Sequence, residues 1–244
     1  MSKILVIGES CLDVFNYGVC DRLCPEAPVP VFNPVHSVEN GGMAKNVYNN
    51  ILALGTPAHL HTNDNWKSIT KTRFIDYRTN HMFMRLDCRD AEFGASKIKR
   101  MSFKKYDAVV ISDYNKGFLS KEDIEYISNK HPCTFLDTKK ELGEWCKGTS
   151  YIKINNYEYE RTKGKIDSEI YEKLIITLGL DGCKFQDVIY PVPKVEIKDT
   201  SGAGDTFIAG LAVKYAEVGK IEEAIEFAND CATKVVQKRG VSAV

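Results

Sequence analysis

The chain has 244 residues with 43% hydrophobic and 27% charged residues, which is ordinary for one large soluble domain with a well-buried core. Its 33 basic and 33 acidic residues balance, so no global charge favours nucleic acid or an acidic membrane as a partner. No run approaches the ~18 apolar residues of a membrane span and the N-terminal apolar run is too short for a signal peptide, so we expect a soluble, cytoplasmic protein.

The eight cysteines form no CxxC pair and show no zinc-like spacing. The closest two are Cys20 and Cys24, and no matching pair of ligands follows them. We interpret them as structural thiols in a reducing compartment.

Short, nearly continuous apolar runs predict the strands. Strands covered on both faces have this pattern, which favours a mostly parallel sheet between helices. We therefore expect a single three-layer α/β/α domain over residues 1–244. The predicted strands are 3–8, 107–112, 133–137, 151–154 and 174–179.

Amphipathic helices are predicted between these strands. One segment at 45–55 places Val47 and Ile51 on a common face. Ser120 is the expected N-cap of a second helix. Apolar residues at three- and four-residue steps predict a final helix over 220–238.

Two segments break the alternation of strands and helices. Residues 14–40 contain four prolines among Val and Phe, which indicates edge-strand material because proline cannot donate to a β-ladder. Residues 72–87 are a second extended piece that turns at 78–80. Together they predict a small β-lid on the main layer, with an irregular surface excursion as the alternative.

The stretch "KDTSGAGDTFIAG" at 198–210 has the composition of a helix start that binds an anion. Thr200 or Ser201 is the expected cap, and Gly202 and Gly204 fall in the first turn, where backbone N–H groups have no intrahelical partner. Asp205 has two interpretations from the residues alone. It is either a partner of the helix dipole or a functional carboxylate.

With its preceding strand, this stretch resembles the signature of the ribokinase-like carbohydrate kinases, the phosphofructokinase-B type superfamily. The resemblance implies a ribokinase-like fold and an ATP-dependent phosphoryl transfer. It assigns Asp205 as the base that takes the proton of the attacking sugar hydroxyl. It assigns the N–H groups around Gly202, Ala203 and Gly204 as the anion hole for the phosphoryl group.

Other strings match the family in the same order. "GGMAKN" implies sugar-hydroxyl contacts at Gly41, Gly42 and Asn46, with Asp13 as their partner, although the glycine pair alone is typical of a plain turn. "NNYE" implies that Asn155 and Glu158 organise Mg²⁺ through water, whereas a solvated glutamate is the alternative. The nucleotide residues implied are Thr177, Gly179, Gly182 and Asn229. The family also leaves open a K⁺ site near 199–200.

Longer strings, including "PEAPVPV", "ISDYNKG" and "DTKK", resemble the kinase domain of the D-glycero-β-D-manno-heptose 7-phosphate kinases found in ADP-heptose synthases. This resemblance implies a heptose phosphate as substrate and a homodimer formed through the lid. Asp113, Lys116 and Lys139 would border the site at strand ends. The expected contacts to the sugar phosphate are Lys45, Arg73 and Arg85, with solvated surface charge as the alternative.

The chain also departs from that pattern. We expect material to be trimmed near 61–70 and 161–173 and no nucleotidyltransferase half after Val244, and Glu9 stands where an aspartate is common. The preferred hypothesis is a sugar kinase acting on the anomeric hydroxyl of a heptose phosphate. Alternatives are another sugar or nucleoside kinase of the superfamily and a catalytically silent nucleotide-binding regulator. A dinucleotide dehydrogenase is disfavoured because no GxGxxG follows the first strand.

Overall fold

Eight strands form the main sheet of the computed structural model, which describes residues 2–238, 240 and 243–244. Their order is β12-β11-β10-β9-β8-β7-β1-β4, and all pairs from β10 to β4 are parallel. The two strands beyond β10 are antiparallel. The expected mostly parallel sheet is confirmed. The bounds are β1 (Ile4–Gly8), β4 (Ala58–His61), β7 (Ala108–Asp113), β8 (Thr134–Thr138), β9 (Tyr151–Asn155), β10 (Leu174–Thr177), β11 (Cys183–Phe185) and β12 (Val188–Tyr190).

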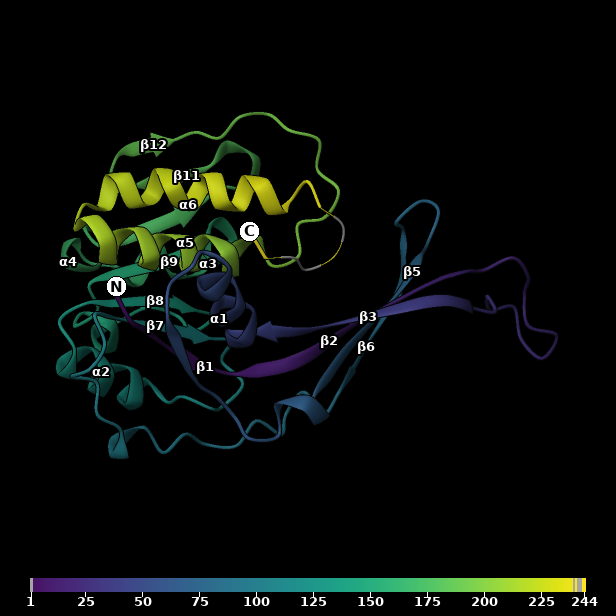
Figure 1. The fold of residues 1–244 in the computed structure, drawn as a ribbon, viewed down its shortest axis with the longest axis horizontal. Coiled ribbons are helices and arrows are strands. Elements are labelled where there is room, and N and C mark those ends of the chain that lie inside the picture. Colours follow the sequence, from purple (N-terminus) through teal and green to yellow (C-terminus); the bar gives the residue numbers. More distant parts are fainter. Residues whose placement is uncertain (1, 239, 241–242) are drawn as a thin grey trace.

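Helices cover both faces of this sheet (Figure 1). Alternate strand residues enter different cores: Val6 packs with the layer of α1, α5 and α6, and Leu5 with the layer of α2 and α4. None of the described helices is both long and apolar enough to cross a bilayer. The helices are α1 (Ala44–Ala53), α2 (Lys121–Lys130), α3 (Asn156–Thr162), α4 (Ser168–Tyr171), α5 (Ala203–Val218) and α6 (Ile221–Val235), with 3₁₀ turns η1 (Trp66–Ser68), η2 (Ile98–Arg100), η3 (Glu144–Cys146), η4 (Lys163–Lys165) and η5 (Gly179–Asp181).

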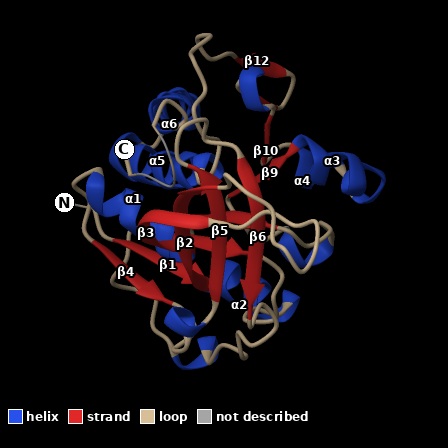
Figure 2. Ribbon diagram, turned by 90° about the vertical axis from the view of Figure 1, so that its right-hand side faces the viewer, coloured by secondary structure: helices blue, strands red, loops and turns tan. Residues whose placement is uncertain are grey.

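A second sheet of four strands extends away from the main body (Figures 1 and 2). Its order is β3 (Asn33–Met43), β2 (Ser10–Val19), β5 (Thr70–Asp76) and β6 (Met82–Cys88), so it draws on both extended segments. The prolines lie in the edge strand β3 or in the loop before it, as expected. Residues 14–19 were wrongly expected at an edge. They belong to the interior strand β2, which has no proline and can pair on both sides.

The second sheet is joined to the main body by very short links. β2 begins one residue after β1, and β3 ends directly before α1. Between β4 and β5 the chain has only the turn η1. This is the region near 61–70 from which we expected a strand and a helix to have been trimmed. The second trimmed region, 161–173, contains only η4 and the short α4 besides the last residues of α3.

Candidate active site

The N-terminus of α5 is the centre of the candidate site. The helix follows Gly202, whose φ of 80° lies in the left-handed region that glycine adopts without strain. Within the described chain neither Thr200 nor Ser201 caps α5 with its side chain, so that prediction was wrong. The Ser201 amide instead donates to the Asp199 carboxylate at 2.8 Å. The Ala203 amide donates to the Thr200 carbonyl at 3.3 Å, whereas the Gly202 and Gly204 amides have no backbone partner among the described residues and can face an external anion.

Asp205, in the first turn of α5, is only 7% exposed. Asn46 Nδ2 donates to its Oδ2 at 2.9 Å, and the Tyr114 hydroxyl donates to its Oδ1 at 2.8 Å. Burial raises the pKa of Asp205 to about 6, although both hydrogen bonds oppose the shift. The result is a carboxylate with a fixed orientation and a proton affinity suited to general base catalysis near neutral pH.

A buried lysine lies beside this helix start. Lys153 Nζ is 2.7 Å from Asp137 Oδ2, and both side chains are almost fully buried. A Cβ atom added to Gly204 would lie 2.8 Å from Lys153 Nζ, so the ammonium group directly adjoins the first turn of α5. The sequence analysis missed Lys153. Its signal was a lysine inside the apolar run "YIKI", because an unpaired charge is rarely buried in a strand.

Asn155 and Glu158 lie together at the N-terminus of α3. They form a capping box, in which the Asn155 side chain accepts from the Glu158 amide and the Glu158 side chain accepts from the Asn155 amide, both at 2.8 Å. Lys139 forms an ion pair with Glu158. Nearby, Asp137 Oδ1 is buried without a hydrogen-bond partner in the described residues.

These carboxylates fit a magnesium ion that is held partly by the ligand. The described residues contain no cluster of three metal-ligating side chains, so they form no closed metal cage. Mg²⁺ in phosphoryl-transfer sites needs only one or two carboxylates together with phosphate oxygens and water. Asp137 Oδ1, which accepts no hydrogen bond from the described residues and lies 3.9 Å from Lys139 Nζ, and the Glu158 carboxylate meet that requirement.

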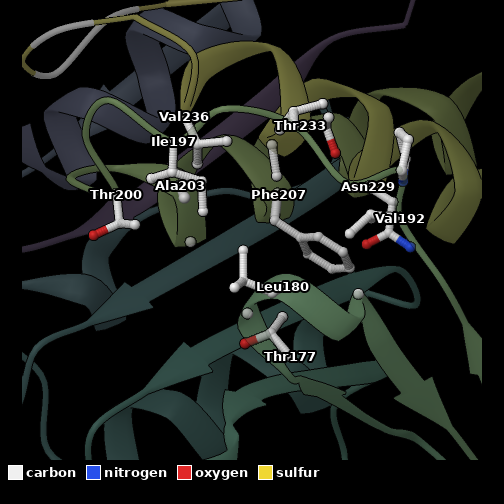
Figure 3. A pocket seen from close by; sticks show the side chains of 16 residues that line it. Thr177, Leu180, Val192, Ile197, Thr200, Ala203, Phe207, Asn229, Thr233 and Val236 are labelled. Carbon is white, nitrogen blue, oxygen red and sulfur yellow. The ribbon is translucent and has the colours of Figure 1, made fainter.

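A cavity of about 220 Å³ adjoins the start of α5 (Figure 3). Ala203 and Gly204 border it, and no charged side chain is among its described lining residues. Phe207 and Leu180 point into it from opposite sides (Figure 3). An apolar slot beside free amides suits a planar base joined to phosphates. The four residues expected to contact a nucleotide all line this cavity: Thr177, Gly179, Gly182 and Asn229.

The sugar-side residues meet where the second sheet joins the body. Asp13 lies on β2, and β2 pairs with the segment of β3 that contains Gly41 and Gly42. A Cβ atom on Gly42 would be 2.2 Å from Asp13 Oδ2, so only glycine lets this carboxylate lie against the strand. Arg73 Nη1 donates to Asp13 Oδ1 at 2.7 Å. Asn46, which lies on α1 directly after β3, donates to Asp205.

A second cavity, of about 290 Å³, lies between the second sheet and the loop before α5. Arg73 and Asn80 line it from the sheet, and Lys198 and Ser201 line it from the loop. Thr200 borders both cavities. The two cavities therefore meet at the helix start that presents Asp205.

Two predicted phosphate contacts are occupied elsewhere. Arg85 forms an ion pair with Asp87 on the same strand, with Nε 2.7 Å from Oδ1. Lys45 Nζ lies 4.3 Å from the centre of the Tyr48 ring, and burial lowers the pKa of Lys45. Neither residue lines the second cavity, whereas Arg73 does, although its guanidinium also forms an ion pair with Asp13.

Hydrogen bonds and an ion pair also fix the loop after β7. Asp113 is buried, and its carboxylate accepts hydrogen bonds from Thr138 and Lys140. Lys116 forms an ion pair with Asp90. In this loop Tyr114, which the sequence analysis quoted but did not select, is the residue that contacts Asp205.

The fold that carries this arrangement is shared with solved structures. The structure resembles the ribokinase from Thermotoga maritima with a TM-score of 0.71 at 17% identity, covering 99% of this chain and 95% of that chain. It also resembles the nucleoside kinase of Methanocaldococcus jannaschii with a TM-score of 0.72 at 17% identity, covering 99% and 93%. The family model of the pfkB family carbohydrate kinase matches residues 45–244. The chain belongs to this family and is a sugar kinase by class.

Curated relatives carry the name bifunctional protein HldE. The protein from Nitratiruptor sp. is 28% identical over 291 residues, covering 98% of this chain and 62% of its own length. The protein from Helicobacter pylori is 32% identical over 300 residues, covering 98% and 64%. The chain thus spans less than two thirds of either relative. Since both aligned stretches exceed 244 residues, these relatives contain segments that this chain lacks.

Proposed function

We propose that this protein is an ATP-dependent kinase that phosphorylates the anomeric hydroxyl of a heptose 7-phosphate. One observation carries the proposal. Asp205 is held by two hydrogen bonds at the start of α5, where a nucleotide-sized apolar cavity meets a second cavity whose charged lining residues are Arg73, Lys198 and Asp199. The identity of the sugar rests on the resemblance of "PEAPVPV" and "ISDYNKG" to heptose phosphate kinases and on the HldE relatives.

In the proposed mechanism, Asp205 takes the proton of the acceptor hydroxyl as that oxygen bonds to the γ-phosphorus and the bond to the leaving ADP oxygen breaks. The amides around Gly202, Ala203 and Gly204 and the ammonium group of Lys153 stabilise the charge on the transferred group. A second sheet closed over the cavities would exclude water as a competing nucleophile.

Magnesium would be held by Glu158 and Asp137, with Asn155 fixing Glu158 through the capping box. When bound, the ion supplies positive charge to the phosphate oxygens. Lys139 contacts Glu158 and has a raised pKa, although burial opposes this, because Asp137 and Glu158 favour its charged form. A potassium site near Asp199 and Thr200 stays a prediction.

The phosphate carried by the sugar would occupy the second cavity beside Arg73 and Lys198. Replacing Lys198 with Ala is expected to raise KM for a phosphorylated sugar about tenfold and leave KM for a free sugar unchanged, because only the former has a charge to pair. Steady-state kinetics on both sugars measure this. Lys194→Ala, at an exposed lysine of the same loop outside the cavity lining, is the matched control. Equal changes of KM for both sugars in the Lys198→Ala variant would show that Lys198 does not contact the phosphate.

A coupled assay of ADP release on phosphorylated sugars, free sugars and nucleosides tests the function itself. Heptose 7-phosphate should give the highest kcat/KM of the panel. A higher value for a free sugar or a nucleoside would support another kinase specificity on the same fold. ATP binding without turnover on any acceptor would support a nucleotide-binding regulator instead.

We further propose a cytoplasmic homodimer formed through the second sheet. Large apolar side chains are exposed on its two edge strands, among them Val35 and Val38 on β3 and Met82, Met84 and Leu86 on β6. Sedimentation should give the mass of a dimer for the whole chain. The double variant Met84→Lys and Leu86→Lys should sediment with the mass of a monomer. If the double variant still sedimented as a dimer, the interface would lie elsewhere.

A further inference from the structure

Tyr114 connects the loop after β7 to the carboxylate of Asp205. Its hydroxyl donates to Asp205 Oδ1 at 2.8 Å, across 91 positions of sequence. Burial and the nearby carboxylates of Asp205 and Asp137 raise the pKa of Tyr114 well above its usual range. The hydroxyl therefore keeps its proton and acts as a hydrogen-bond donor near neutral pH.

Glu9 fixes the backbone around Tyr114 from one side. This fully buried glutamate, between β1 and β2, accepts from the Tyr114 amide at 2.9 Å and from the Lys116 amide at 3.0 Å. Asn115 between them has a φ of 56°, so the chain makes a left-handed turn around the carboxylate. One side chain thus satisfies two loop amides, a role that the sequence pattern did not show.

Asp113 fixes the same loop from the other side. Its carboxylate accepts from the Asn115 amide at 3.2 Å and from the side chains of Thr138 and Lys140. The loop therefore has two independent anchors, and Tyr114 projects from the segment between them. Such a pre-organised donor keeps its hydrogen bond at little cost in conformational entropy.

We propose that Tyr114 is a positioning residue for Asp205, which orients the carboxylate so that a lone pair faces the acceptor hydroxyl. The inference rests on the proposed function. Asn46 holds Oδ2 and Tyr114 holds Oδ1, so the plane of the carboxylate cannot turn away from the acceptor. In the reaction the acceptor proton goes to Asp205, and the tyrosine proton stays where it is.

Tyr114→Phe tests this through the pH profile. With the substrate that the enzyme accepts best, kcat/KM of the unmodified enzyme should fall below about pH 6, where Asp205 becomes protonated. Losing the hydroxyl removes a hydrogen bond that stabilises the charged form of Asp205, which raises the pKa of Asp205. The fall of kcat/KM should therefore begin about one pH unit higher. Asp137, Lys153 and Lys139 also act on Asp205 and are unchanged in the variant. A profile lowered equally at all pH values, with no shift, would overturn the inference.

A second measurement does not depend on turnover. The carboxyl ¹³C resonance of Asp205, assigned by its absence in Asp205→Asn, should titrate about one unit higher in Tyr114→Phe. An unchanged titration overturns the inference. A shifted titration in an enzyme without kinase activity keeps it while rejecting the proposed function. Tyr126→Phe is the matched control, since its ring packs on Phe103, and a comparable shift there would also overturn the inference.

Discussion

Asp205→Asn is expected to lower kcat by about 10³-fold while the affinity for ATP changes by less than about twofold. General base catalysis contributes ~10²–10⁴-fold, and an asparagine of the same shape cannot take up the proton. The affinity should persist because Asp205 does not line the apolar cavity that is expected to bind the nucleotide. Initial rates give kcat, and calorimetry with a non-hydrolysable ATP analogue gives the affinity.

Asp230→Asn provides the comparison for this variant. Asp230 is an exposed carboxylate on α6, so the same chemical change there should leave kcat unchanged. If Asp205→Asn retained full turnover, Asp205 would not be the base. If the variant lost nucleotide binding together with turnover, the carboxylate would serve the nucleotide and not the acceptor.

Gly8→Ala is expected to lower the free energy of unfolding by about 3 kcal/mol or more, because overpacking a central strand forces the backbone to move. Gly8 ends β1 and pairs with Ser112 of β7. A Cβ atom there would lie 1.9 Å from the Ser112 carbonyl oxygen and 3.2 Å from the Cβ of Ala44. A backbone oxygen inside the sheet cannot swing aside as a flexible side chain can. Urea denaturation followed by circular dichroism measures the change.

Gly164→Ala is the control for the fold. Gly164 lies in η4, and a Cβ atom there meets no atom within 4 Å, so the unfolding free energy should change by less than about 0.5 kcal/mol. A Gly8→Ala protein with the urea midpoint of the unmodified protein would show that β1 and β7 can separate freely. In that case the packing of the central strands would be looser than the structure indicates.

The central strands were predictable from sequence because burial on both faces leaves a continuous apolar run, as in Ile4–Gly8. The edge strands β4 and β12 were not predicted. β4 contains two histidines in four residues, and β12 is three residues long and mostly exposed. At an edge, one side of the strand meets water or loops, so the apolar pattern that identifies a central strand is lost.

The helix start at Asp205 was predictable because its functional residues are adjacent in sequence. The contact between Tyr114 and Asp205 was not, since it depends on how the loop after β7 and the start of α5 are placed in three dimensions. The phosphate contacts expected at Lys45 and Arg85 stay predictions. Arg85 finds Asp87 two residues away on the same strand, and such a local pairing competes with any distant ligand.

The two sheets divide the site between them. The contacts expected for the acceptor, Asp13, Gly41 and Gly42, lie on strands of the second sheet, whereas the apolar cavity is built by the main sheet and its flanking segments. Under the proposed function, substitutions in those few strands would change the acceptor without disturbing the cavity for the nucleotide. Because of this separation, specificity for the acceptor can evolve step by step while the residues for phosphoryl transfer are conserved.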